Sequence, residues 1–240
     1  SKDGLRLLEV VVKLGRNMMI SGSTSSGKTS VLNVLSAMIP PSERILVLED
    51  ASELQLQQPH TVCFETRKPD EHNKGEVSIR DLVHSSLRLR PDRIVIGEIR
   101  GAEAIDLLQA MNTGHDGTMS TIHANSPQDC LVRLENCAMQ NGLGMPQAAL
   151  RAQVTSAVQI VIQTARLHDG SRRITHISEV RPLQDGEYRC EDIVRFEETG
   201  PAEERKIRGH HVFTGYQPSF CAAARKRGHD LSGLFLSQDT

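Results

Sequence analysis

The segment from Gly22 to Thr29 constrains this chain most strongly, because it reads GSTSSGKT and fits the phosphate-loop pattern G-x-x-x-x-G-K-[ST]. An apolar run from Met18 to Ile20 precedes the loop and predicts a buried strand, and a helical pattern of apolar residues begins at Val31. A strand, a loop and a helix N-terminus in this order form a cradle of backbone N–H groups for an anion. We therefore predict a nucleotide-binding loop rather than a solvated surface turn.

The residues of this loop have distinct expected roles. A lysine in this position reaches the β- and γ-phosphates, and the hydroxyl of the next residue is a ligand of Mg²⁺. We therefore assign the phosphate contact to Lys28 and the metal contact to Thr29. The residues expected to bind the nucleotide are Gly22, Ser23, Thr24, Ser25, Ser26, Gly27, Lys28, Thr29 and Ser30.

Composition limits the classes of protein that remain. The 240 residues include 28 Lys and Arg against 30 Asp and Glu, which gives a formal net charge of -2. Such a chain has no global positive field, so we expect no nucleic-acid partner. No apolar run approaches the length of a bilayer span, and no signal-peptide pattern opens the chain. We expect a cytoplasmic protein, for which a peripheral membrane role stays open.

The cysteines point in the same direction. The chain has five, an odd number, and none forms a C-x-x-C pair. This pattern argues against a disulfide framework or a zinc site and favours a reducing cytoplasm. Cys130 and Cys137 lie seven residues apart on a predicted helix, so they share a face and are expected in the core.

Apolar runs alternate with helical patterns along most of the chain. The predicted strands after the loop cover 45–48, 93–96, 118–122 and 159–165. The predicted helices cover 3–14, 78–89, 103–112 and 127–142, with another starting at Pro146. This alternation predicts an α/β fold with helices on both faces of a mainly parallel sheet.

The pattern changes after about Leu167. Alternating apolar residues on both sides of a tight turn at 185–187 predict an antiparallel ribbon, which a polar tail with a basic helix follows. The expected division is a helix over 1–14, an α/β core over 15–166, and C-terminal antiparallel strands with a helical tail over 167–240.

The first of these units is expected to be a linker helix. Its apolar positions Leu5, Leu8, Val11 and Val12 have helical spacing. Because it stands so close to the phosphate loop, we take it to come from an N-terminal domain that this chain lacks.

Carboxylates follow two of the predicted strands. Glu49 and Asp50 end one strand, with Glu53 close behind, and Glu98 ends another. The carboxyl ends of parallel strands are where such sheets bind ligands. Glu49 is expected to hold the Mg²⁺ shell or position a water, and the alternative is an acidic helix cap. Glu98 is expected to orient or deprotonate the attacking water, and the alternative is a surface pair with Arg100.

Two histidines flank the predicted strand at 118–122. They are His115 and His123, in the segment TGHDGTMSTIHANSP. A neutral histidine at a strand end can donate a hydrogen bond to a γ-phosphate. On the residues alone, a structural role for His123 stays open beside this catalytic one.

The segments GSTSSGKT, LEDASEL, GEIRG and GHDGTMSTIHANSP occur in the order Walker A, acidic box, Walker B and histidine box. In this order they closely resemble the type II/IV secretion and pilus ATPase superfamily. The longer segments ELQLQQPH and SLRLRPDRIVIGEIRG are similar to the CpaF-like ATPases of tight-adherence (Flp) pilus assembly. The resemblance extends from about Leu14 to Phe220, which is nearly the whole chain.

The resemblance implies a RecA-like ATPase domain that assembles into a hexameric ring, with ATP at the seam between this domain and an N-terminal domain. Glu98 would be the carboxylate that activates the attacking water, and Glu49 would lie near Mg²⁺. Both carboxylates would reach the metal ion through water. His123 would couple the γ-phosphate to domain motion. The implied function is an ATPase motor at the inner membrane, where it acts on a platform protein to assemble pilin or export substrate.

Two departures from the family pattern affect these expectations. Ser23 and Ser25 replace glycines of the usual GGTGSGKT, and a serine is strained wherever the loop needs φ > 0. The second departure is the missing N-terminal region, which supplies arginines to the nucleotide in the family. We therefore expect weak hydrolysis by this chain alone. The arginines that could act at a neighbouring subunit's site are Arg67, Arg88, Arg90, Arg100 and Arg133.

Two other functions are compatible with a phosphate loop on such a core. One is a RecA-like DNA translocase, which needs concentrated basic loops that this chain does not carry. The other is a non-hydrolysing nucleotide switch that only recruits partners.

Overall fold

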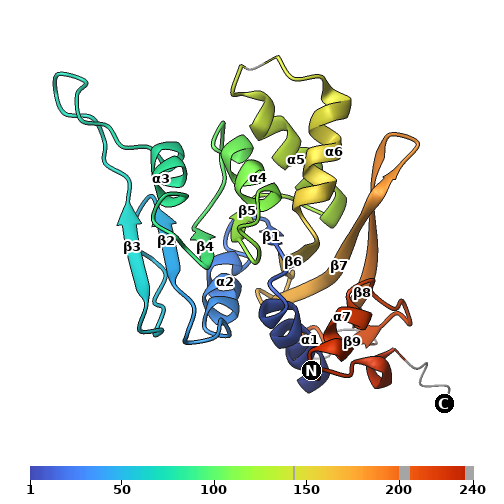
Figure 1. Cartoon of the computed structure of the whole chain (residues 1–240). Helices are drawn as coiled ribbons and strands as arrows, with labels where there is room; N and C mark the ends of the chain where they lie inside the picture. The colour runs from blue at the N-terminus through green and yellow to red at the C-terminus, as the bar shows by residue number, and fades with distance from the viewer. Residues whose placement is uncertain (143, 200–205, 236–240) are drawn as a thin grey trace.

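The computed structural model describes residues 1–142, 144–199 and 206–235 (Figure 1). The strands are β1 Met18–Gly22, β2 Ile45–Glu49, β3 Thr61–Glu65, β4 Arg93–Ile96, β5 Met119–Ile122, β6 Ile160–Arg166, β7 Arg172–Gln184, β8 Glu187–Glu198 and β9 Gly209–Phe213. The helices are α1 Lys2–Lys13, α2 Lys28–Ser36, α3 Ile79–Ser86, α4 Ala104–Asn112, α5 Pro127–Met139, α6 Gln147–Ala157 and α7 Cys221–Lys226, followed by a short 3₁₀ turn, Ser232–Leu234.

These strands form one sheet in the order β3-β2-β4-β5-β1-β6-β7-β8-β9. The strands from β3 to β6 pair in parallel, and those from β6 to β9 pair antiparallel. The predicted α/β class with a mainly parallel sheet is therefore confirmed. The predicted ribbon, β7 and β8, continues the sheet from β6, because Ile162 pairs with Ile177 across the junction.

Helices cover both faces of the sheet (Figure 1), as the alternating pattern predicts. Residues of α3 to α6 pack on one face, and residues of α1, α2 and α7 pack on the other. The parallel strands supply apolar side chains to both layers. On β1, Met19 faces the first layer while Met18 and Ile20 face the second, which is the alternation of a strand buried on both sides. Cys130 and Cys137 are fully buried in the first layer, as expected.

Helix α1 is packed into the second layer rather than standing apart from it. Leu8, Val11 and Val12 of its predicted apolar face are buried. Leu5, on the same predicted face, is instead 53% exposed. It lies one turn nearer the N-terminus, where it lines an open apolar groove with Leu8 and Ile177.

The structure also contains two strands that the sequence pattern does not predict, β3 and β9. Both are short and lie at the two edges of the sheet, where one side of each strand is unpaired within the described residues. Edge strands are half-buried, so they lack the continuous apolar run that identifies the central strands. Two helices are shorter than predicted. Helix α3 ends at Ser86 instead of residue 89, and α5 ends at Met139 instead of residue 142.

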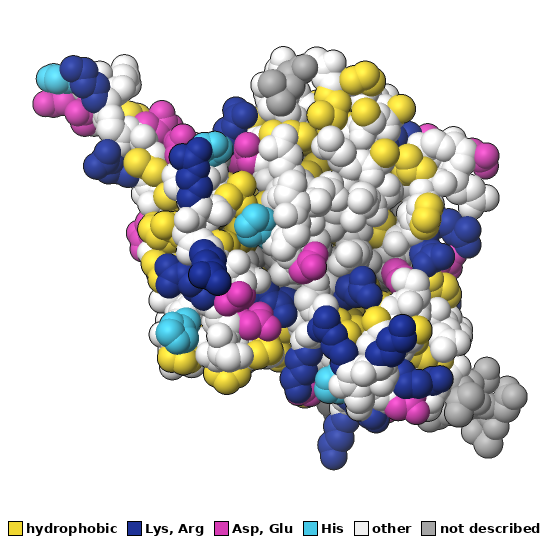
Figure 2. Space-filling model, in the orientation of Figure 1, with side chains coloured by type: hydrophobic (Ala, Val, Ile, Leu, Met, Phe, Trp, Pro, Cys, Tyr) yellow, Lys and Arg dark blue, Asp and Glu magenta, His cyan; other side chains and the backbone are white. Residues whose placement is uncertain are grey.

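A long loop between β3 and α3 projects from the body of the protein (Figure 1). An isolated antiparallel bridge between Arg67 and Val77 closes its base. Beyond the bridge the loop carries exposed charged side chains of both signs (Figure 2). In the lower part of the face that Figure 2 shows, Lys and Arg side chains gather, with fewer Asp and Glu side chains among them.

Candidate active site

The phosphate loop leaves β1 at Gly22 and enters α2 at Lys28. Its two pattern glycines are needed for different reasons. A Cβ on Gly22 would lie 2.2 Å from Thr164 Oγ1 and 2.4 Å from Ser26 Oγ, so no side chain fits there. Gly27 caps α2 with φ 99°, in the left-handed region that favours glycine.

The two serines that depart from the family pattern have different backbone conformations. Ser25 has φ 60°, which is the left-handed region, whereas Ser23 is not among the described residues with positive φ. Of these two serines, Ser25 has the positive φ that strains a residue with a side chain, and Ser23 does not. A serine in this conformation costs on the order of 1 kcal/mol relative to glycine.

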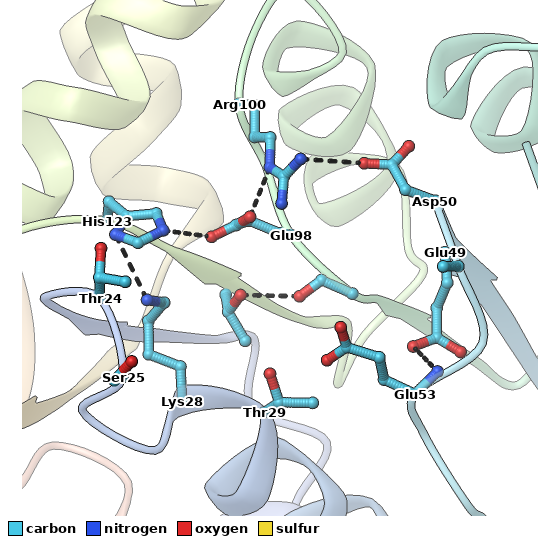
Figure 3. Close-up of a pocket in the computed structure, with 13 residues that line it drawn as sticks. Thr24, Ser25, Lys28, Thr29, Glu49, Asp50, Glu53, Glu98, Arg100 and His123 are labelled. Carbon is cyan, nitrogen blue, oxygen red and sulfur yellow. Dashed lines mark hydrogen bonds and ion pairs between the residues drawn. The ribbon is translucent and has the colours of Figure 1, made fainter. Parts of the chain in front are cut away.

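Lys28 is buried at the mouth of the loop. Its Nζ donates to the carbonyl oxygens of Gly22 and Ser23, at 3.2 Å each, and lies 3.4 Å from His123 Nδ1 (Figure 3). Burial lowers the pKa of the ammonium, and the nearby Glu98 carboxylate partly offsets this. A desolvated ammonium held by weak carbonyl acceptors is well placed to exchange them for phosphate oxygens.

Glu98 follows β4 and is bonded on both carboxylate oxygens (Figure 3). Its Oε1 lies 2.9 Å from His123 Nε2, and its Oε2 accepts from Arg100 Nε. Arg100 Nη1 also lies 3.5 Å from Asp50 Oδ2, and its hydrogen bond to Glu98 raises the pKa of the guanidinium. The surface pair with Arg100 thus exists, but the same carboxylate also faces the predicted catalytic histidine.

Glu49 ends β2 and is 4% exposed. Its Oε1 accepts the backbone N–H groups of Glu53 and Leu54 at 3.2 Å and 3.1 Å, which orders the loop after the strand. Burial raises the pKa of this carboxyl group, and these two hydrogen bonds partly offset the effect. Gly97 packs closely against this side chain, because a Cβ on it would lie 3.2 Å from Glu49 Cγ, a tight contact.

A cavity of about 370 Å³ joins these groups at the carboxyl ends of the parallel strands (Figure 3). Its lining residues are Thr24, Ser25, Lys28, Thr29, Glu49, Asp50, Ala51, Glu53, Gly97, Glu98, Arg100, Thr121 and His123. The predicted residues Lys28, Thr29, Glu49, Glu98 and His123 therefore meet around one space. Of the other loop residues, Ser26 is turned away and bonds Thr164 Oγ1 at 2.8 Å, and Ser30 is exposed.

The structure separates the remaining candidates. Among the five arginines, Arg100 lines this cavity, and Arg67 lines an adjoining one that shares Glu98 and Arg100. The other three, Arg88, Arg90 and Arg133, are exposed and line neither space. His115 lies at the opposite end of β5 from His123, where its carbonyl accepts from Thr118 Oγ1 at 2.7 Å.

Some residues of the site do not stand out in the sequence. Thr121 Oγ1 donates to the Gly97 carbonyl at 2.7 Å and so ties β5 to the segment that carries Glu98. Thr164 on β6 contacts the phosphate loop through Ser26. Both contacts depend on which strands are neighbours. The only local signal is the hydroxyl-rich character of the segments around them.

The cavity suits Mg²⁺, which prefers oxygen ligands and usually keeps several waters beside one or two protein ligands and the substrate's phosphates. Thr29 offers a hydroxyl, and Glu49, Asp50, Glu53 and Glu98 surround the same space. Within the described ranges, no group of three or more His, Cys, Asp or Glu side chains could hold a metal unaided.

The described helices include none that is long and apolar enough to cross a membrane.

A phosphate loop at the carboxyl end of β1, a carboxylate after β4 and the intervening strand β5 on a mostly parallel sheet define a RecA-like core. A solved VirB11 ATPase of the Brucella suis type IV secretion system, in complex with sulphate, superposes with a TM-score of 0.67 at 31% identity, over 74% of this chain and 52% of that one. A Legionella pneumophila ATPase, DotB, shares the fold at TM-score 0.56 and 20% identity, over 72% of this chain and 47% of that one.

The family model described as type II/IV secretion system protein matches residues 1–221, and the chain belongs to this family. The type IV secretion system protein PtlH of Bordetella pertussis is 42% identical over 171 residues, which is 69% of this chain and 50% of PtlH. The conjugal transfer protein TrbB of Rhizobium radiobacter is 34% identical over 185 residues, 76% of this chain and 54% of TrbB. The chain thus spans about half the length of these curated relatives. The resemblance to secretion ATPases is confirmed at the level of the family.

Proposed function

We propose that this chain is the ATPase domain of a motor that powers pilus assembly or protein secretion. The observation that carries the proposal is the convergence of Lys28, Glu98 and His123 on one cavity beside the phosphate loop. Membership of the type II/IV secretion family supports it, because that family includes ATPases such as the Brucella VirB11 protein.

In this proposal, the loop N–H groups and Lys28 hold the β- and γ-phosphates of ATP. Thr29 would hold Mg²⁺, with Glu49 and Glu98 reaching it through water, and a bound ion would neutralise charge on the phosphate oxygens. Glu98 orients the attacking water and accepts its proton, since its carboxylate lies at the cavity wall facing His123. His123 donates to the γ-phosphate and reports its presence, because it stands between Lys28 and Glu98.

We propose further that the protein is closest to the CpaF-like pilus ATPases and works as a hexameric ring at the cytoplasmic side of the inner membrane. A platform protein there would receive the motion. The charge required at the site supports a ring, because phosphoryl transfer needs an arginine or an equivalent cation to stabilise the transition state. The guanidinium of Arg100 already pairs with Glu98 and Asp50, so a second subunit or domain would supply the cation.

The test is Mg²⁺-dependent ATP hydrolysis by the product of the complete gene. Glu98→Gln should retain ATP binding within about twofold and lose turnover by about 100-fold or more, as expected for loss of a catalytic base. Glu71→Gln, on the exposed projecting loop, removes the same charge away from the site and serves as the control.

The competing functions give different results in the same assay. Tight binding without turnover, indifferent to Glu98→Gln, would indicate a nucleotide switch. Turnover that DNA stimulates and that collapses with added salt would indicate a translocase. The formal net charge of -2 does not favour that outcome.

A further inference from the structure

Gln163 occupies a position on β6 that links it to two parts of the candidate site. In the sheet register it pairs with Ser21, the residue before Gly22 at the base of the phosphate loop. On the other side of β1, Ser21 pairs with Ile122, which precedes His123. The base of the loop therefore lies between Gln163 and the segment that carries the histidine.

The carboxamide of Gln163 is bonded at both ends and is buried, with only 4% of the residue exposed. Ser21 Oγ donates to Gln163 Oε1, and Gln163 Nε2 donates to the carbonyl oxygen of Ala124 at 3.2 Å. Because a carbonyl oxygen can only accept, the NH₂ group must face Ala124, and this leaves Oε1 for the Ser21 hydroxyl. The side chain thus crosses β1 and reaches the residue next to His123.

The neighbouring residue on β6 makes a different set of contacts. Thr164 Oγ1 donates to the Ser21 carbonyl at 2.9 Å and bonds Ser26 Oγ at 2.8 Å. Both partners belong to β1 or the phosphate loop. Thr164 therefore supports the loop, whereas Gln163 connects the loop to the histidine segment.

We propose that Gln163 is a positioning residue that holds His123 at a fixed place relative to the phosphate loop. The inference rests on the proposed function, in which His123 meets the γ-phosphate that Lys28 binds. A buried carboxamide ties two segments together because leaving its donor or acceptor unpaired is costly. A shift of the loop on nucleotide binding is therefore passed to Ala124 and His123 through one side chain.

The test compares Gln163→Met, which keeps the length of the side chain without its hydrogen bonds, with Thr164→Val. The first readout is the ring NMR signals of His123 in the nucleotide-free chain, assigned with His123→Ala. The second is the affinity for Mg²⁺ with ADP and with a non-hydrolysable ATP analogue. Gln163→Met should displace the His123 signals and reduce the preference for the ATP analogue about fivefold, the size of one lost hydrogen bond, while ADP affinity is retained.

Thr164→Val should weaken both nucleotides alike and leave the His123 signals in place. Gln163→Glu is the second variant, because it keeps the acceptor for Ser21 and loses the donor to Ala124, so it should move His123 as Gln163→Met does. His123 signals that stay in place in both Gln163 variants, or equal weakening of both nucleotides, would overturn the inference. A chain that binds neither nucleotide would contradict the proposed function instead, and the His123 signals would still decide the role of Gln163.

Discussion

His123 Nε2 lies 2.9 Å from Glu98 Oε1, and the other ring nitrogen of the same histidine lies 3.4 Å from Lys28 Nζ. One imidazole therefore stands between the lysine expected at the phosphates and the carboxylate expected at the attacking water. The three side chains come from α2, the end of β4 and the end of β5. Their relative positions depend on the sheet that carries these elements.

This relationship predicts a selective effect of His123→Ala. Turnover of ATP should fall about 10- to 100-fold, because the group that links the γ-phosphate to Glu98 is lost. The affinity for ADP should change by less than about twofold, since ADP lacks that phosphate. Steady-state kinetics and direct ADP titration measure the two effects. His115→Ala is the control, because His115 flanks the other end of β5, and equal losses in both variants would contradict the assignment.

A second prediction concerns the two serines of the phosphate loop. Ser25→Gly should stabilise the protein by about 0.5 kcal/mol, because relief of about 1 kcal/mol of strain at φ 60° exceeds the cost of about 0.5 kcal/mol from the freedom that glycine adds to the unfolded chain. Ser23→Gly should destabilise it by about 0.5 kcal/mol, because glycine adds freedom to the unfolded chain without relieving strain. Urea unfolding of both variants gives the two signs. A loss of stability in Ser25→Gly would mean that the loop gains nothing from glycine there.

A third prediction is a pH dependence at Glu49. Burial raises its folded-state pKa above the usual 4.5, so ionisation of this carboxyl group opposes folding. Its contribution to stability is complete below about pH 4.5 and is lost as the pH rises through the folded-state pKa. Glu49→Gln cannot ionise and still offers an oxygen to the N–H groups of Glu53 and Leu54. The stability of the variant relative to the parent should therefore rise between pH 4.5 and pH 8 in urea unfolding, whereas parallel pH profiles would argue against a raised pKa.

A fourth prediction separates a buried ion pair from an exposed one at the same arginine. Arg151 Nε lies 3.2 Å from Glu135 Oε2, whose side chain is 2% exposed, and Arg151 Nη1 lies 3.1 Å from Glu187 Oε1, whose side chain is 75% exposed. Glu135→Ala should cost about 3 kcal/mol of unfolding free energy, because it removes the buried acceptor of Gln147 Nε2 and Arg151 Nε, while Arg151 Nη1 keeps Gly186 and Glu187. Glu187→Ala should cost less than about 1 kcal/mol. Similar costs in thermal or urea unfolding would show that burial does not govern this cluster.

The parts of the site that could be predicted are those that one segment encodes locally. The phosphate loop needs glycines, a lysine and a hydroxyl at fixed offsets, and the apolar strand before Glu98 marks that carboxylate as a strand-end group. The helices on both faces follow from the alternating patterns, and the structure confirms them. The roles of Glu49, Glu98 and His123 stay predictions, although the structure gathers these residues around one cavity.

What could not be predicted depends on the register between strands that are distant in sequence. Three residues, Thr121, Thr164 and Gln163, contact the site only because of the strand order. In that order β5 lies between β4 and β1, and β6 lies on the other side of β1. The edge strands β3 and β9 lack a continuous apolar run, and the exposure of Leu5 at an open groove is not visible in the helical spacing of α1. Periodicity along the chain carries none of this information, since it reports one face of one element at a time.

The intervening strand β5 has an electrostatic consequence. Neighbouring strands lie about 4.8 Å apart, so β1 and β4 stand about 10 Å apart with β5 between them. Lys28, which follows β1, and Glu98, which follows β4, therefore face each other across this strand, and the carboxylate still acts on the ammonium by a Coulomb interaction. The strand keeps the two groups out of a direct ion pair, and the imidazole of His123, which contacts both, occupies the space between them.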